Sequence, residues 1–132
     1  MIGLDTNVVV RHLAQDDQIQ SAIATRFISR LSRERPGFIS AVVLAEVTWV
    51  LSRAYKASRE DVAKAVEGLL RSAELVVENA EAAYRALGVY QTSKSGEYAD
   101  ALIAQTASLA GASETVTFDQ SAASSFGMRL LR

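Results

Sequence analysis

A regular alternation of short apolar runs with longer segments of helical periodicity is the feature that most constrains the fold. The short runs are rich in residues that suit a pleated sheet, and they are as apolar as buried parallel strands are. No repeat, low-complexity tract or linker interrupts them, so we expect one α/β domain over residues 1–132. The expected strands are 2–4, 38–40, 75–77, 115–118 and 128–131, and the expected helices lie near 19–33, 42–55, 59–71, 80–92 and 98–110.

Two acids follow expected strands directly. Asp5 comes after "IGL" and Asp119 comes after "TVTF". In a parallel α/β sheet, binding sites gather beyond the carboxyl ends of the strands, so both acids are candidates for a functional site. Aspartate is also a common helix N-cap, because its carboxylate accepts backbone N–H groups, and that structural interpretation stays open for each of them.

Two further acids lie in expected helices. Glu46 has Val42, Val43, Trp49 and Val50 as its helical neighbours, which predicts an apolar face where a lone carboxylate is costly to bury. A solvent-exposed helix edge is the alternative for Glu46. Asp100 lies near the first turn of its helix, where the helix dipole also favours an acid.

Taken together, these four carboxylates predict a metal site. Acids held close to one another repel strongly, and a hard cation such as Mg²⁺ or Mn²⁺ accepts oxygen ligands and leaves positions for water and phosphate. The chain has no cysteine and one histidine, so an oxygen-rich site is the natural choice. Such a site supports phosphodiester hydrolysis.

Composition bounds the other possibilities. The absence of cysteine excludes a disulfide framework and a cysteine nucleophile, and it fits a reducing cytoplasm. The longest apolar run, "AVVLAEVTWVL", is too short to span a bilayer. A formal net charge of −1 gives no general attraction to nucleic acid, so a polyanion needs a local basic patch or metal ions.

Alternative functions share parts of this pattern. A phosphatase of the haloacid-dehalogenase type needs a second acid two residues after Asp5, where this chain has Asn7. A receiver domain needs a phosphorylatable aspartate after a middle strand, and "FIS" supplies none. A non-catalytic interaction domain whose acids are structural caps remains open. His12 has no accompanying nucleophile motif, so we interpret it as a helix residue.

Four segments of the chain resemble the successive motifs of a known family: "MIGLDTNVVVRHL", "FISAVVLAEVTWVL", "EYADALIAQTASLAG" and "TVTFD". They look like those of PIN-domain ribonucleases, particularly VapC-type toxins of bacterial toxin–antitoxin pairs, from Met1 nearly to the C-terminus. The resemblance implies a three-layer α/β/α fold with a central, mostly parallel sheet of four or five short strands. It also implies Mg²⁺- or Mn²⁺-dependent endonucleolytic cleavage of RNA. A housekeeping RNA-processing nuclease of the same family is the nearer alternative to a toxin.

The resemblance also assigns roles to residues. The acids that match the family's metal-binding and catalytic positions are Asp5, Glu46, Asp100 and Asp119. The residues that would organise this acidic site through hydrogen bonds are Thr6, Asn7 and Thr117. Glu97 stands where the family more often has aspartate, so its role stays open, as does that of the nearby Lys94.

Partners are expected on two grounds. Residues 42–71 read as two consecutive helices with more apolar surface than a small sheet covers, which predicts an interface. The residues concerned are Trp49, Leu51, Tyr55, Val62, Val66, Leu69 and Leu70. The resemblance to VapC toxins implies a homodimer and a groove for an antitoxin segment, with DNA reached only through the antitoxin.

Overall fold

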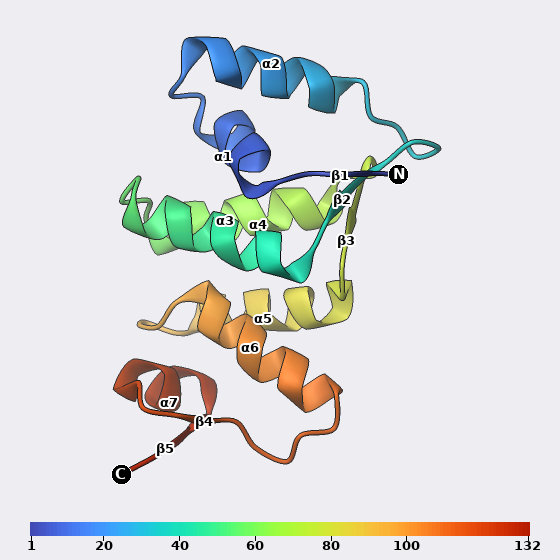
Figure 1. Ribbon diagram of the computed structural model, residues 1–132. Coiled ribbons are helices and arrows are strands. Elements are labelled where there is room, and N and C mark those ends of the chain that lie inside the picture. The colour runs from blue at the N-terminus through green and yellow to red at the C-terminus, as the bar shows by residue number, and fades with distance from the viewer. The chain divides into compact units, whose positions relative to one another are not determined.

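The computed structural model describes residues 1–132, which form two compact units, Met1–Glu78 and Asn79–Arg132 (Figure 1). Each unit is described by itself. The first contains β1 (Ile2–Gly3), α1 (Thr6–Ala14), α2 (Gln18–Ser29), β2 (Gly37–Ile39), α3 (Ala41–Arg53), α4 (Arg59–Arg71) and β3 (Leu75–Val77). The second contains α5 (Ala80–Thr92), α6 (Tyr98–Leu109), β4 (Val116–Thr117), α7 (Gln120–Phe126) and β5 (Arg129–Leu130).

The sheet of the first unit has three parallel strands in the order β1-β2-β3. Ile2 pairs with Gly37, and Phe38 pairs with Val76. Gly37 is closely packed, because a Cβ at this position would lie 2.8 Å from Leu31 Cδ1 and that side chain would have to shift. The central strand carries Ile39, which is fully buried. Short apolar strands joined by helices therefore form a parallel sheet, as the sequence predicts.

Side-chain caps start the helices of this unit. Asp17 Oδ1 accepts from the backbone N–H groups of Ile19 and Gln20 at 3.1 and 2.8 Å, and α2 begins there. Ser40 Oγ accepts from Val43 N, and Ser58 Oγ accepts from Asp61 N, each at 3.1 Å. Each cap satisfies an N–H group that the first helical turn leaves unpaired, so the serines fix where α3 and α4 begin.

The helix pair α3 and α4 buries most of the apolar residues that we expected at an interface. Leu51, Val62, Val66 and Leu69 are at most 7% exposed, so they form core rather than docking surface. The expected interface, which the sequence placed on only some of the seven residues, therefore stays a prediction that these four do not support. Helical spacing places the three α4 residues on one face, and that face packs inward. Trp49 differs, being 53% exposed, with the Arg53 guanidinium 5.6 Å from its ring centroid.

The second unit is built on the packing of α5 against α6. Ala82, Ala83 and Ala86 are fully buried, and small side chains of this kind allow two helices to approach closely. Tyr98, at the start of α6, is 1% exposed, and its hydroxyl donates to the Ala83 carbonyl oxygen at 2.9 Å. Its ring meets Tyr90 edge-on, with ring centroids 5.9 Å apart. Tyr98 thus anchors the first turn of α6.

A second parallel ladder joins β4 and β5, with Val116 opposite Arg129. Helix α7 connects these two strands and ends at Gly127, whose φ of +71° suits a residue without a side chain. Gly96 precedes α6 at φ +91°, and a Cβ there would collide with the Phe126 ring. All five expected strands exist, but they pair as a three-stranded and a two-stranded ladder, one in each unit.

Candidate active site

Thr6 joins two of the predicted site carboxylates in the first unit. Its backbone N–H donates to Asp5 Oδ1 at 2.7 Å, and its hydroxyl donates to Glu46 Oε1 at 2.8 Å. Asp5 lies two residues beyond the end of β1 and is the N-cap residue of α1, while Glu46 comes from the middle of α3. One threonine therefore holds its neighbour Asp5 and also Glu46, which is 40 positions from Thr6 in the chain.

Asp5 and Glu46 line one hollow of the first unit, with a volume of about 310 Å³. Thr6 and Asn7 line it as well, and Arg11 and Tyr55 add a basic and a phenolic group. This space accommodates several water molecules or a phosphate group. The first unit thus offers carboxylate, hydroxyl, amide and guanidinium groups around one small cavity.

The expected buried environment of Glu46 is wrong. Glu46 is exposed, and its helical neighbours Val42 and Trp49 are 68% and 53% exposed. The apolar pattern of α3 divides between an inward face, with Leu44 and Val47 fully buried, and an outward face that carries Glu46. The carboxylate is therefore free of a large desolvation cost, and its position beside Thr6 is what places it in the cavity.

Arg11 and Tyr55 form a polar network at the edge of the same cavity. Arg11 Nη1 lies 3.3 Å from both carboxylate oxygens of Asp16 and donates to the Tyr55 hydroxyl at 3.2 Å. That hydroxyl donates to Asp16 Oδ2 at 2.7 Å, and Arg11 Nε donates to Gln20 Oε1 at 2.8 Å. The Tyr55 hydrogen bond, aided by Arg11, holds the pKa of Asp16 below its usual value.

The predicted acid of α6 occupies the first turn of that helix. Asp100 is half-buried, and its backbone N–H donates to the Glu97 carbonyl oxygen at 3.1 Å. Glu97 is the N-cap residue and makes no side-chain cap hydrogen bond. Tyr98 lies between these two acids, and burial raises the pKa of its hydroxyl. The Tyr98 anchor therefore determines where this turn presents its acids.

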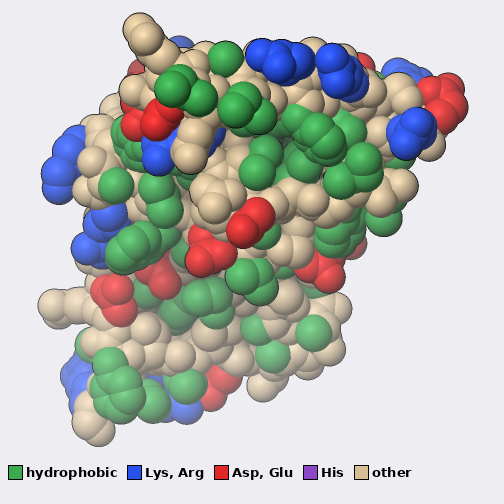
Figure 2. Space-filling model, turned by 45° about the horizontal axis from the view of Figure 1, so that its top comes forward, with side chains coloured by type: hydrophobic (Ala, Val, Ile, Leu, Met, Phe, Trp, Pro, Cys, Tyr) green, Lys and Arg blue, Asp and Glu red, His purple; other side chains and the backbone are tan.

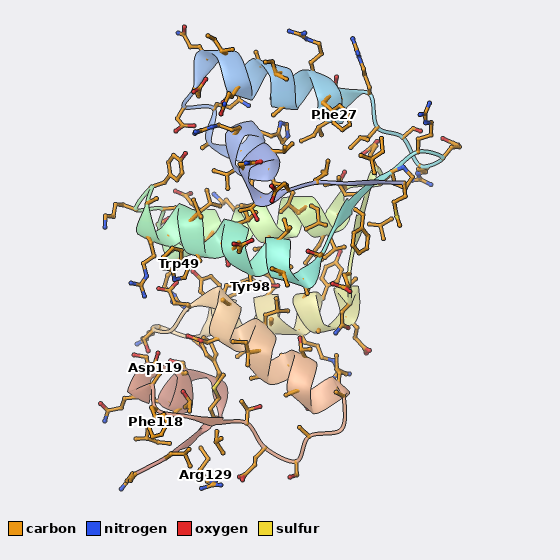
Figure 3. The ribbon with its side chains drawn as sticks, in the orientation of Figure 1. Phe27, Trp49, Tyr98, Phe118, Asp119 and Arg129 are labelled. Atoms are coloured by element: carbon orange, nitrogen blue, oxygen red, sulfur yellow. The ribbon has the colours of Figure 1, made fainter.

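Asp119 caps α7, as the structural alternative predicts. Its Oδ1 accepts from Ser121 N at 2.8 Å and from Ala122 N at 3.3 Å. Thr117 Oγ1 accepts from the backbone N–H of Asp119 at 2.9 Å and so fixes the turn that follows β4. Figure 3 shows Phe118 and Asp119 together on this turn. Both cap hydrogen bonds use Oδ1, and Oδ2 takes no part in the cap.

The comparisons with known proteins identify a family. The family model for the PIN domain matches residues 2–124. The chain belongs to the PIN-domain family. No curated protein and no solved structure matches it significantly.

Membership of the PIN family confirms the expected fold class. Seven helices and a small parallel sheet are consistent with the three-layer α/β/α PIN fold. PIN domains are generally nucleases that act on nucleic acid, and they usually use Mg²⁺ or Mn²⁺. No helix of this PIN domain is both long and apolar enough to cross a bilayer.

The predicted acids of this PIN domain have the type of ligand atom, carboxylate oxygen, that a hard cation binds. Each unit contains two of the predicted carboxylates, and oxygen ligands of this type are those that Mg²⁺ and Mn²⁺ prefer. No three histidine, cysteine or acidic side chains stand in an arrangement that would hold a metal ion. The joint action of Asp5, Glu46, Asp100 and Asp119 therefore stays a prediction, as do the supporting roles of Thr6, Asn7 and Thr117.

Sequence reasoning missed Arg11 as a cavity residue and Tyr98 as an anchor, and it assigned Tyr55 to an apolar surface. Tyr55 instead uses its hydroxyl in the network beside the acids. The spacing of Arg11 and Asp16 across the end of α1 was a usable signal, because a basic and an acidic residue there can meet over the turn. His12 Nδ1 lies 3.0 Å from Thr25 Oγ1, a hydrogen bond that links α1 to α2 and is consistent with a structural role for His12.

Proposed function

We propose that this PIN domain is an endoribonuclease that hydrolyses RNA phosphodiester bonds and depends on Mg²⁺ or Mn²⁺. The observation that carries the proposal is the cavity in which Thr6 holds Asp5 and Glu46 together, in a chain whose family generally comprises nucleases. Asp5, Glu46, Asp100 and Asp119 serve as the acids of the reaction. When bound, the metal ion supplies a water of lowered pKa and stabilises charge on the leaving oxygen.

The chain's own groups divide the remaining work. Asp5 Oδ1 and Glu46 Oε1 each accept a hydrogen bond from Thr6, so one oxygen of each carboxylate is oriented and the other is left for a ligand. Thr117 orients Asp119 through the backbone in the same way. Such support reduces the motion of carboxylates that would otherwise repel one another. Asn7 lines the cavity and contributes an amide for substrate or water.

As the finer function, we propose the toxin component of a toxin–antitoxin pair, acting in the cytoplasm as a homodimer. A protein partner is supported by α2, where Ile19, Ile23 and Phe27 are 74%, 55% and 41% exposed. Ile23 and Phe27 line a groove of about 520 Å³ between α2, α1 and β1. Figure 2 shows hydrophobic side chains gathered on this side of the first unit, and Figure 3 labels Phe27 on the side of α2 that faces β1. The proposal that an antitoxin segment occupies this groove is based on the resemblance to VapC toxins.

Two alternatives have observations in their favour. Asp5 and Asp119 are helix caps, which is what a non-catalytic interaction domain would show. A housekeeping RNA-processing nuclease would have the same acids but no antitoxin. A neighbouring reading frame for a small DNA-binding protein favours the toxin, and a monomer in light scattering at micromolar concentration contradicts the homodimer.

The experiment that tests the proposal maps new RNA ends. Purified protein, freed of any antitoxin, is incubated with total cellular RNA in Mg²⁺, in Mn²⁺ and in EDTA, with Asp5→Asn as the matched control. We expect internal cuts that require the metal and that the variant does not make. Cleavage that persists equally in EDTA or in the variant shows that the assigned acids are wrong. If no metal-dependent ends appear, the nuclease proposal fails.

A further inference from the structure

Arg11 is the only basic residue that lines the cavity of Asp5 and Glu46. An RNA phosphate that approaches two carboxylates is repelled unless a cation lies close by. The chain as a whole offers no such attraction, because its formal net charge is −1. The cation that brings a phosphate to this cavity must therefore be a local one, either a metal ion or this guanidinium.

The geometry of Arg11 suits a fixed phosphate ligand. Nε is held by Gln20 on α2, and Nη1 is held by Asp16 and Tyr55, so residues from three segments orient one planar group. These bonds engage Nε and Nη1, and they leave Nη2 for an outside acceptor. The Arg11 side chain is 33% exposed, so a ligand can reach it. A guanidinium oriented in advance loses little freedom when it binds a phosphate oxygen.

We propose that Arg11 binds a backbone phosphate of the RNA next to the Asp5 and Glu46 cavity, and that Asp16 and Tyr55 are positioning residues for its guanidinium. This inference rests on the proposed function. The contact is to phosphate, so it contributes affinity and register but no base preference. Asp16 also competes with the phosphate for Arg11, because Asp16 Oδ1 lies 3.3 Å from Arg11 Nη1 and binds the same guanidinium.

This double role of Asp16 predicts opposite effects of two substitutions. Arg11→Gln removes the phosphate contact and weakens RNA binding by about tenfold, the order expected for one charge-assisted hydrogen bond. It also lowers the slope of log affinity against log salt by about 0.7, the value for one contact to a single strand. Asp16→Asn keeps the shape of the network and frees the charge of Arg11, so RNA binding becomes tighter. If the network is only structural, both changes leave RNA binding unchanged or weaken it.

The measurement is fluorescence anisotropy of a labelled single-stranded RNA of mixed sequence, in Mg²⁺ and at several KCl concentrations. All proteins carry Asp100→Asn so that the probe is not cut. Arg85→Gln and Glu81→Gln are the matched controls, because these residues form a surface ion pair at 3.2 Å and line none of the cavities described above. Thermal melts of every variant exclude loss of folding, and Arg11→Met, which also removes the charge but keeps an unbranched side chain, is used if Arg11→Gln does not fold.

The outcomes separate this inference from the proposed function. Weaker binding and a shallower salt slope for Arg11→Gln, with tighter binding for Asp16→Asn and neither effect in the control pair, support the phosphate contact. Equal affinity and slope for Arg11→Gln and Arg85→Gln overturn it while RNA binding itself stands. If the parent protein binds no RNA at any salt concentration, the proposed function fails and the role of Arg11 fails with it.

Discussion

Replacing Tyr98 with phenylalanine tests whether its hydroxyl holds the first turn of α6. The hydroxyl is the only group removed, and it donates to the Ala83 carbonyl oxygen at 2.9 Å. The ring, 1% exposed and edge-on to Tyr90, keeps its packing in the variant. A net hydrogen bond of this kind contributes about 1 kcal/mol, so Tyr98→Phe lowers the free energy of unfolding by about 1 kcal/mol at neutral pH.

The same substitution has a second, pH-dependent effect. Burial raises the pKa of Tyr98 in the folded protein, whereas an unfolded tyrosine ionises at about pH 10. The folded state therefore keeps a proton that the unfolded state loses. Stability from this group is complete below about pH 10 and falls by about 1.4 kcal/mol per pH unit above it. Phenylalanine has no proton to lose, so the difference between the two proteins closes between about pH 10 and pH 11.

Urea unfolding followed by circular dichroism, at pH 7.5 and at several values from 9 to about 11, measures both effects. All other tyrosines are common to the two proteins, so their ionisation cancels in the difference. A variant as stable as the parent at pH 7.5 refutes the hydrogen-bond anchor. A stability difference that stays constant above pH 10 refutes the claim that burial keeps the Tyr98 hydroxyl protonated.

Three further predictions follow from the contacts described above. Gly96→Ala lowers the free energy of unfolding by about 1–3 kcal/mol, because φ is +91° and the new Cβ meets the Phe126 ring. Its control in the same urea assay is Gly127→Ala, which costs about 1 kcal/mol because φ is +71° but the space around it is open. Thr6→Val removes the hydrogen bond to Glu46 and slows RNA cleavage by about tenfold at an unchanged melting temperature. Thr6→Ser keeps the hydroxyl and most of the cleavage rate. Equal cleavage rates for the two variants would count against the role of the hydroxyl. Asp100→Asn abolishes cleavage and leaves metal-free thermal stability equal or slightly higher, since it removes like-charge repulsion, and a grossly unfolded variant would instead indicate a structural cap.

Several elements could be predicted from the sequence because local signals and packing agree. Helix α4 has the expected bounds, since Ser58 caps its start and Val62, Val66 and Leu69 repeat at helical spacing. Helix α5 and strand β3 also have the expected bounds. Helix α7 was missed, because seven residues are too few to show a period. Strands of two or three residues likewise contain no information on whether they join in one ladder or two.

The candidate site was less predictable than the fold. The strand-end positions of Asp5 and Asp119 could be read from the sequence, because an acid directly after a short apolar run is visible without a structure. The exposure of Glu46 could not, since the apolar residues of α3 surround it on the helix and only packing decides which face turns inward. The contact of Thr6 with Glu46 joins residues 40 positions apart, and no local pattern specifies such a pair.

The most direct test of the central claim is a Mn²⁺ titration followed by NMR, because Mn²⁺ broadens the signals of nuclei near its binding site. The account predicts that the backbone amides of Thr6, Glu46, Asp100 and Asp119 lose intensity together at low Mn²⁺, while the amides of Glu60 and Glu114 do not. Asp5→Asn should abolish the effect at all four positions. Broadening confined to one of the two pairs, or spread evenly over all acidic residues, would contradict a single metal site made by these four acids.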